Sequence, residues 1–252
     1  MAENSKIQWT DHTWNIAVGC KKVDSDCKFC YMYRGSLNET RYNPMVVRKT
    51  LRNTFNMPLR LKEPSKIFVS SLTDVFIEDI DNFRDEMWNI IRYCPQHTFQ
   101  ILTKRPERIA KCLPPDWGHG WDNVWIGTSV GSQGSSHRIA DIIMQTTKVN
   151  INQMFLSLEP LHSEVIIDHK LLALFDWVIV GGESGNETGK YRYRPCEIQW
   201  IERIVNDCKA LEVPVFVKQL GTHLAKELNL KDRHGGNIDE FPINLKIRQF
   251  PV

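Results

Sequence analysis

The chain has 252 residues, of which 42% are hydrophobic and 25% are charged, and its formal net charge is +2. This composition is that of an ordinary globular protein, and the length suits one α/β domain with a substantial core. The longest apolar runs are far too short to cross a bilayer and the first residues hold no apolar signal segment, so we expect no membrane association and a cytoplasmic location. In that reducing compartment, seven cysteines are better explained as thiols or metal ligands than as a disulfide framework.

A repeated pattern runs along the chain, in which a short β-rich apolar segment ends in polar or glycine residues and a helix-like segment follows. The predicted strands cover residues 13–18, 66–70, 98–103, 124–128, 153–157, 177–180 and 213–217, and the predicted helices cover 83–94, 137–144 and 198–211. Several of these strands are continuously apolar, which is typical of strands buried on both faces of a parallel sheet.

This pattern predicts an α/β fold, namely a complete or partial (β/α) barrel of the TIM-barrel type. A doubly wound open sheet is the competing architecture, but no glycine-rich dinucleotide fingerprint follows the first strand. No linker rich in proline, glycine or serine interrupts the chain. We therefore expect a single domain over 1–252, with its core in 1–221 and an irregular polar tail over 222–252.

Three cysteines lie within eleven residues directly after the first predicted strand, at Cys20, Cys27 and Cys30. Thiolates are soft ligands that suit zinc or an iron–sulfur cluster, and the C-x-x-C spacing of the last two lets both sulfurs reach one metal. A closed structural zinc site has four protein ligands, for which His12 is the local fourth candidate; without it, a coordination position stays open. The remaining cysteines lack such spacing and are interpreted as packing residues: Cys94, Cys112, Cys196 and Cys208.

Polar and charged residues follow strand after strand. In a (β/α) barrel the carboxyl ends of the strands meet at one mouth, where catalytic residues lie. We expect the following residues to bind substrate or to act in catalysis there: Lys104, Arg105, Glu159, Gly181, Gly182, Glu183 and Lys218. The alternative is that strands end in polar residues at the surface and that lysine–glutamate pairs serve only structure.

A basic segment follows the cysteines, since residues 34–66 hold eight lysines and arginines against two glutamates, with tyrosines in or beside it. Such a segment can hold a phosphate backbone and stack bases, so it predicts a nucleotide or nucleic-acid substrate. Arg48, Lys49 and Arg52 are the residues that we assign to this contact. The alternative is an ordinary solvated face.

Considered together, these stretches resemble the radical S-adenosylmethionine enzymes, and more closely a phage- and bacteria-borne three-cysteine-motif family of uncharacterised proteins. The resemblance extends over nearly the whole chain, to about Gly221. The segments that carry it are 8-QWTDHTWNIAVGC-20, 27-CKFCY-31, 68-FVSSLTDVF-76, 98-TFQILTKRPER-108, 124-VWIGTSV-130, 156-LSLEPL-161, 177-WVIVGGESG-185 and 214-PVFVKQLG-221.

The resemblance implies that the three cysteines bind a 4Fe–4S cluster, whose fourth iron holds S-adenosylmethionine. An electron from an external donor would then yield a 5′-deoxyadenosyl radical. It implies cofactor contacts at Phe29, which would pack near the adenine, and at Ser70, Ser71, Asp74 and Ser129. Two features of this chain differ from the commonest sequence pattern of the radical S-adenosylmethionine enzymes. Six residues, KKVDSD, separate the first two cysteines, and the glycine–glycine–glutamate element comes late, so we assign it to substrate.

Two other functions remain open at this point. One is a non-catalytic nucleic-acid-binding, phage-associated or defence-associated module with a structural zinc ion, which a fourth protein ligand would favour. The other is a cluster-free barrel hydrolase with Glu159 or Glu183 as general base. The sequence names no protein partner and does not specify the reaction that follows radical formation.

Overall fold

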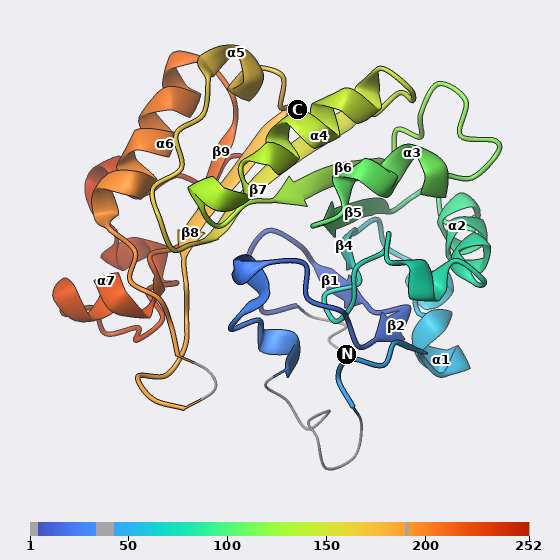
Figure 1. Cartoon of the computed structure of the whole chain (residues 1–252), viewed down its shortest axis with the longest axis horizontal. Coiled ribbons are helices and arrows are strands. Elements are labelled where there is room, and N and C mark those ends of the chain that lie inside the picture. The colour runs from blue at the N-terminus through green and yellow to red at the C-terminus, as the bar shows by residue number, and fades with distance from the viewer. Residues whose placement is uncertain (1–4, 34–42, 190–191, 252) are drawn as a thin grey trace. The chain divides into compact units, whose positions relative to one another are not determined.

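The structure is a computed structural model that describes residues 5–33, 43–189 and 192–251 (Figure 1). The chain divides into two compact units. The first comprises Met1–Val23, Tyr31–Thr128 and Asp141–Gln153, and the second comprises Asp24–Cys30, Ser129–Ala140 and Met154–Val252. Each unit combines parallel strands with helices, which confirms the α/β class. Within the described ranges, no helix has the length and apolar character needed to cross a membrane.

The first unit is built on parallel strands. In their spatial order they are β1 (His12–Trp14), β4 (Lys66–Val69), β5 (Thr98–Thr103) and β6 (Val124–Ser129), the last of which ends in the second unit. The central residues Phe68 and Ile101 face Thr13 and Ile126 on the neighbouring strands, and these strands are buried along most of their length. The strands predicted over 66–70, 98–103 and 124–128 are therefore confirmed.

Helices pack on this unit through apolar residues at helical spacing. They are α1 (Arg52–Phe55), α2 (Arg84–Tyr93) and α3 (Ile109–Cys112), while α4 (His137–Thr146) begins in the second unit and ends in the first. Helix α2 buries Met87, Trp88 and Ile91, and the Trp88 indole donates to the Cys112 carbonyl at 2.9 Å. The helices predicted over 83–94 and 137–144 are confirmed, because their 3.6-residue apolar repeat matches the buried face.

The segment 13–18 was expected to be one strand, and this expectation is wrong. Strand β1 ends at Trp14, and β2 (Ala17–Val18) pairs instead with β3 (Arg48–Lys49) in a separate antiparallel ladder. The chain leaves the parallel sheet at Asn15, whose carbonyl and that of Ile16 accept hydrogen bonds from Thr50. The cysteine loop therefore follows a short antiparallel strand rather than a strand of the parallel sheet.

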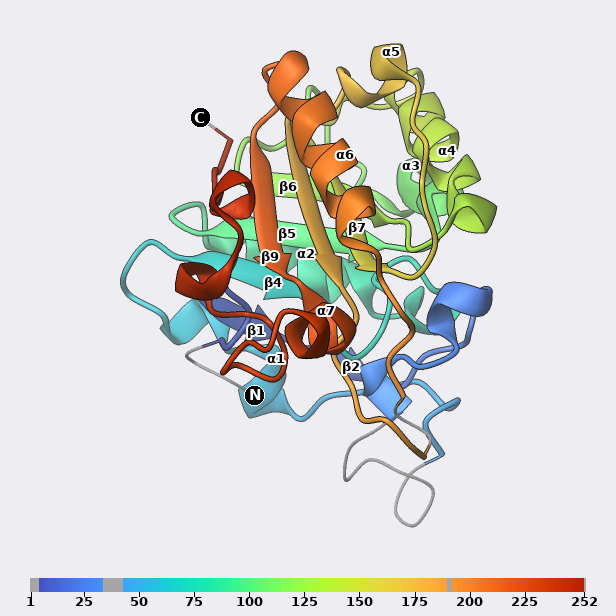
Figure 2. The same ribbon diagram turned by 90° about the vertical axis from the view of Figure 1, so that its left-hand side faces the viewer.

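The second unit contains the parallel strands β7, β8 and β9. These elements are β7 (Gln153–Leu161), β8 (Trp177–Gly182), β9 (Val215–Gln219), α5 (His169–Leu172), α6 (Ile198–Ala210) and α7 (Gly221–Glu227). Helix α6 packs against β8 and β9, and Figure 2 shows it running alongside β8. It buries Ile201, Ile204, Val205 and Cys208, which confirms the helix predicted over 198–211.

Close packing of the strand ends explains the glycine pair of β8. A Cβ atom at Gly181 would lie 2.7 Å from the Gln219 carbonyl oxygen, and one at Gly182 would collide with the Leu220 carbonyl. The tail after Gly221, which the sequence predicts to be irregular, begins instead with helix α7. Its last part returns to the sheet, where Phe250 stacks on Trp177 with ring centroids 5.4 Å apart.

Candidate active site

Cys20 lies in the first unit, next to a buried guanidinium group. The loop that carries it is tied to the turn after β4, because Gly19 N donates to the Leu72 carbonyl at 3.1 Å. Tyr33 Oη donates to the Cys20 carbonyl at 2.7 Å, and Arg105 Nη2 donates to the Lys21 carbonyl at 2.8 Å. Burial alone would lower the pKa of Arg105, but the adjacent Asp74 and Cys20 raise it above its usual value. The Arg105 guanidinium therefore lies beside the Cys20 thiol.

Asp74 uses its carboxylate within the protein. It is buried and accepts hydrogen bonds from Thr103 Oγ1 at 2.8 Å, Lys104 N at 2.9 Å and Arg105 Nη1 at 3.1 Å. It also accepts one from Phe76 N at 2.9 Å. These bonds fix the carboxyl end of β5 and aim Arg105 at the cysteine loop. Asp74 therefore orients Arg105 in this structure.

The turn before Asp74 has features of a binding site. Ser70 has a positive φ of 65°, which is rare for a residue with a side chain and is often retained at functional sites. The Ser70 and Thr73 hydroxyl groups are buried, and no atom of the described residues forms a hydrogen bond with them. Ser71 Oγ donates to Asn15 Oδ1 at 3.2 Å, which holds the turn. Buried hydroxyls usually have hydrogen-bond partners, so these two are unusual among the described residues.

Cys27 and Cys30 lie in the second unit, on one tight turn. Cys27 N donates to the Asp24 carbonyl at 3.1 Å, and Cys30 N donates to the Cys27 carbonyl at 3.4 Å. Cys27 is buried and Cys30 is half-buried. The Phe29 ring between them has the Lys28 ammonium at 5.4 Å and the Arg194 guanidinium at 5.5 Å from its centroid. The two thiols are therefore presented by one compact element, with an aromatic ring between them.

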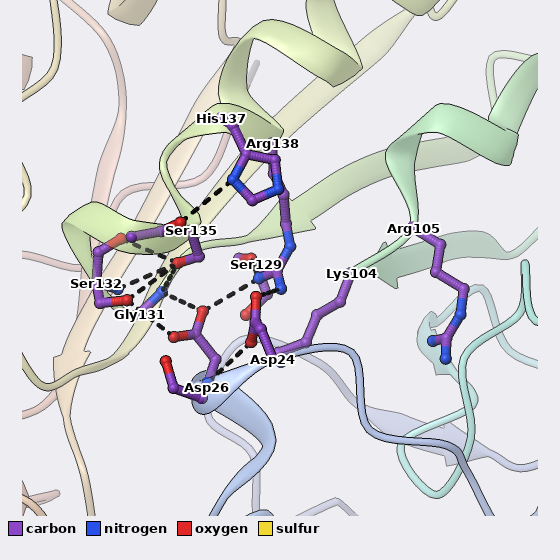
Figure 3. Close-up of polar contacts among 12 residues, drawn as sticks. Asp24, Asp26, Lys104, Arg105, Ser129, Gly131, Ser132, Ser135, His137 and Arg138 are labelled. Carbon is purple, nitrogen blue, oxygen red and sulfur yellow. Dashed lines mark hydrogen bonds and ion pairs between the residues drawn. The ribbon is translucent and has the colours of Figure 1, made fainter.

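The residues between the cysteines hold this turn in place (Figure 3). Asp26 is buried and lies within hydrogen-bonding distance of Gly131 N at 3.0 Å, Arg138 Nη1 at 3.1 Å and His162 Nε2 at 2.8 Å. Burial would raise the pKa of Asp26, but these bonds and the Arg138 charge hold it well below its usual range. Asp24 pairs with the same guanidinium and accepts from Asp26 N at 2.9 Å. The two aspartates of the KKVDSD segment therefore anchor the cysteine turn to the residues around Arg138.

Glu183 supports the same turn indirectly, through Arg194. Arg194 donates to it through N, Nε and Nη2, each at 2.8 Å, and Arg194 Nη1 donates to the Ser25 carbonyl at 3.0 Å. Glu183 is 5% exposed, so its charge is consumed by this pair. The glutamate of the GGE element thus binds Arg194, which in turn contacts the cysteine turn at Ser25.

Glu159 and Lys218 form an ion pair. Both side chains are largely buried, and the Glu159 carbonyl accepts a hydrogen bond from Ser129 Oγ at 3.3 Å. Lys104 is half-buried at the end of β5 in the first unit. Lys104 thus belongs to the first unit, and the Glu159–Lys218 pair belongs to the second.

The residues assigned to nucleic acid lie on an exposed ladder. Arg48 and Lys49 form β3, and Arg52 begins α1; all three are exposed. Lys49 pairs with Glu86 at 2.5 Å and lies over the Phe55 ring, so part of its charge is already neutralised. Arg34, Arg41 and Tyr42 of the same basic segment lie outside the described residues.

No preformed metal site is present among residues 5–33, 43–189 and 192–251, where no three histidine, cysteine, aspartate or glutamate side chains are grouped to hold an ion. Cys20 belongs to the first unit, whereas Cys27 and Cys30 belong to the second. The donor chemistry nevertheless fits a thiolate-bound cluster, because a guanidinium lies beside Cys20 and one turn presents the other two thiols.

The four other cysteines are buried, as predicted. Burial raises the pKa of Cys196 and of Cys208 to about 12, with a smaller contribution from a neighbouring carboxylate.

Iodoacetamide at neutral pH should therefore modify Cys20 and Cys30 well before Cys196 and Cys208, since only thiolates react and only the first two are accessible. Mass spectrometry of peptides from the native protein measures these rates. Equal labelling of Cys196 and Cys30 would contradict this assignment.

Sequence reasoning missed the residues that attach the cysteine turn, namely Asp24, Asp26, Arg138, His162 and Arg194. A partial signal was present, because a D-S-D segment just before a cysteine favours a capped turn. Arg138 carries no such signal, since its carboxylate partners Asp24 and Asp26 lie more than 100 positions away along the chain.

Residues 4–244 match the model of the family described as "Protein of unknown function (DUF5131)", and the chain belongs to this family. Searches of curated proteins and of solved structures gave no match. The match includes all three loop cysteines and the strand ends described above. Arguments about function therefore depend on the chemistry of these residues.

Proposed function

We propose that the protein is a radical S-adenosylmethionine enzyme in which Cys20, Cys27 and Cys30 bind a 4Fe–4S cluster. The observation that carries the proposal is the contrast among the cysteines. Cys94, Cys112, Cys196 and Cys208 are buried packing residues, whereas the loop places Cys20 beside Arg105 and presents buried Cys27 and half-buried Cys30 on a single polar turn. Three thiolates without a fourth protein ligand suit a cluster that keeps one iron for a cofactor.

Such a cluster with bound S-adenosylmethionine supplies reductive cleavage of the sulfonium to an organic radical, using one electron from an external donor. The chain would bind and orient the cofactor. Phe29 offers a ring for stacking on the adenine, and the buried hydroxyls of Ser70 and Thr73 offer polar contacts. Ser71 and Ser129 are further cofactor contacts of the proposal.

The proposal includes a complete or partial (β/α) barrel whose mouth holds the substrate. Lys104 and the Glu159–Lys218 pair would contribute to that mouth, together with Gly181 and Gly182. Because Asp74 and Glu183 each have their charge satisfied by an arginine, we assign them an orienting role at Arg105 and Arg194. This revises their expected roles as direct contacts.

Anaerobic reconstitution with iron and sulfide tests the cluster. The expected product is brown and holds about four irons per chain. Elemental analysis that finds zinc alone, in a colourless protein, would overturn the proposal in favour of a structural zinc site. The measurement needs no knowledge of the substrate.

The substrate class that we propose is a nucleotide or nucleic acid, because Arg48 and Arg52 expose positive charge beside the cysteine loop in the sequence. Changing Arg48, Lys49 and Arg52 to glutamate should weaken single-stranded RNA or DNA binding and lower the salt slope by about 2. Fluorescence anisotropy over a range of salt concentrations measures both. Matched charge reversals at exposed Lys148, Lys231 and Arg233 should leave binding near wild type; if wild type binds nothing at low salt, this substrate assignment is wrong.

A further inference from the structure

The carboxylate of Asp26 occupies a site that has the donors of an anion-binding pocket. Gly131 N, Ser132 Oγ and Arg138 Nη1 lie 3.0, 3.1 and 3.1 Å from its oxygens, and His162 Nε2 lies 2.8 Å away. The pocket comes from the loop between β6 and α4, from α4 itself and from the residue after β7. Backbone amides, a hydroxyl and a guanidinium are the donors that proteins use for carboxylates and phosphates.

The shape of the pocket is as specific as its donors. A Cβ atom at Gly131 would lie 2.7 Å from the Pro160 carbonyl oxygen and 3.2 Å from Asp26 Cγ, so glycine permits the close approach. The Arg138 side chain is 1% exposed and also donates to the Ser129 carbonyl at 2.8 Å. These bonds hold Arg138 in a fixed orientation, which makes the pocket a rigid receptor for the Asp26 carboxylate.

We propose that Asp26 is a positioning residue whose carboxylate, by filling this pocket, sets the placement of Cys27 and Cys30 for cluster binding. Asp26 directly precedes Cys27. Two further backbone hydrogen bonds couple Asp26 to both cysteines. Lys28 N donates to the Ser25 carbonyl at 3.0 Å, and Cys30 N donates to the Cys27 carbonyl. A buried ion pair is an inefficient source of net stability, so we infer that this one serves to fix the geometry of the turn.

This inference rests on the proposed function for its ligand, and a chemical-rescue experiment tests it. Asp26→Ala removes only the carboxylate, and formate is the matching small anion for the vacated pocket. We expect the affinity for iron, measured by titration of the reconstituted protein, to fall about tenfold to a hundredfold. Formate should restore the urea unfolding midpoint but not iron affinity, because untethered formate cannot hold the cysteine turn.

A purely structural role predicts a different result, in which formate restores stability and iron affinity together; that result, or unchanged iron affinity in Asp26→Ala, would overturn the proposal. The matched control is Asp232→Ala, which removes another carboxylate that accepts backbone N–H groups in a loop of the same unit. Iron affinity of this control should stay at the wild-type value. Loss of affinity in both variants would show a general effect of loop loosening and would also overturn the proposal.

A second measurement separates this inference from the proposed function. In the iron-free protein, Asp26→Ala should speed alkylation of Cys27, which is 8% exposed, about tenfold relative to Cys208, because its turn is released. Added formate should not lower the alkylation rate of Cys27 in Asp26→Ala. Wild-type protein that binds no iron would end the proposed function, yet this rate would still decide the role of Asp26. An unchanged rate in Asp26→Ala would overturn the positioning proposal whatever the iron result.

Discussion

Replacing Arg138 with methionine should lower the free energy of unfolding by about 3–5 kcal/mol, because it leaves the buried Asp26 carboxylate without its charged partner. Arg138 is 1% exposed and bonds to Asp24, Asp26 and the Ser129 carbonyl. Methionine fills similar space but donates none of these bonds. Urea denaturation followed by circular dichroism measures the loss.

Arg203→Met is the matched control for this change. Arg203 pairs with Glu164 in the same unit at 3.0 Å, but both side chains are exposed, at 49% and 40%. Exposed pairs contribute about 0–1 kcal/mol, so the control should lose less than that. If Arg138→Met and Arg203→Met both lower the free energy of unfolding by less than about 1 kcal/mol, Arg138 does not hold the cysteine turn.

The acid limb of the stability profile should depend on the same carboxylate. Because hydrogen bonds and Arg138 hold the pKa of Asp26 far below its usual range, its contribution is present above the unfolded-state pKa of about 4. That contribution is lost as the pH falls from about 4 toward the much lower folded-state value. Asp26→Asn should flatten this limb, and urea midpoints between pH 2 and 6 would reveal it; a wild-type slope in Asp26→Asn would contradict the assignment.

Replacing Cys27 with alanine should reduce reconstituted iron from about four per chain to well below one, since two thiolates are too few to hold the cluster. Iron analysis and visible absorbance after anaerobic reconstitution measure the loss. The same outcome is expected for Cys20→Ala and for Cys30→Ala.

Cys94→Ala provides the control, because Cys94 is buried at the end of α2 and burial raises the pKa of its thiol. This variant should keep the wild-type iron content even if its stability falls modestly. Full iron in Cys27→Ala, or equal loss in Cys94→Ala, would contradict the assignment of the loop cysteines as ligands.

Much of the fold could be predicted from periodicity alone. The continuous apolar run of β8 and the helical apolar repeat of α6 both reflect which residues are buried. Such patterns can be recognised in the sequence alone. The segment 13–18 could not be predicted, because its break at Asn15 depends on hydrogen bonds from Thr50, which is distant in the sequence. Helix α7 was missed because its seven residues are too short for a clear repeat.

The site was predictable to a smaller extent. Local spacing singles out Cys20, Cys27 and Cys30, but no local pattern shows that Asp26 pairs with Arg138 across 112 positions. The same limit explains the revised roles at the strand ends. A carboxylate at the end of a strand can serve a ligand or an arginine, and only the folded chain brings Arg194 to Glu183.

Cleavage of S-adenosylmethionine tests the central claim most directly. Reconstituted wild-type protein with dithionite should form 5′-deoxyadenosine and methionine under anaerobic conditions, detected by liquid chromatography, while Cys27→Ala should stay at the protein-free background. A protein that carries about four irons yet forms no 5′-deoxyadenosine, or one that Cys27→Ala matches in rate, would contradict the account.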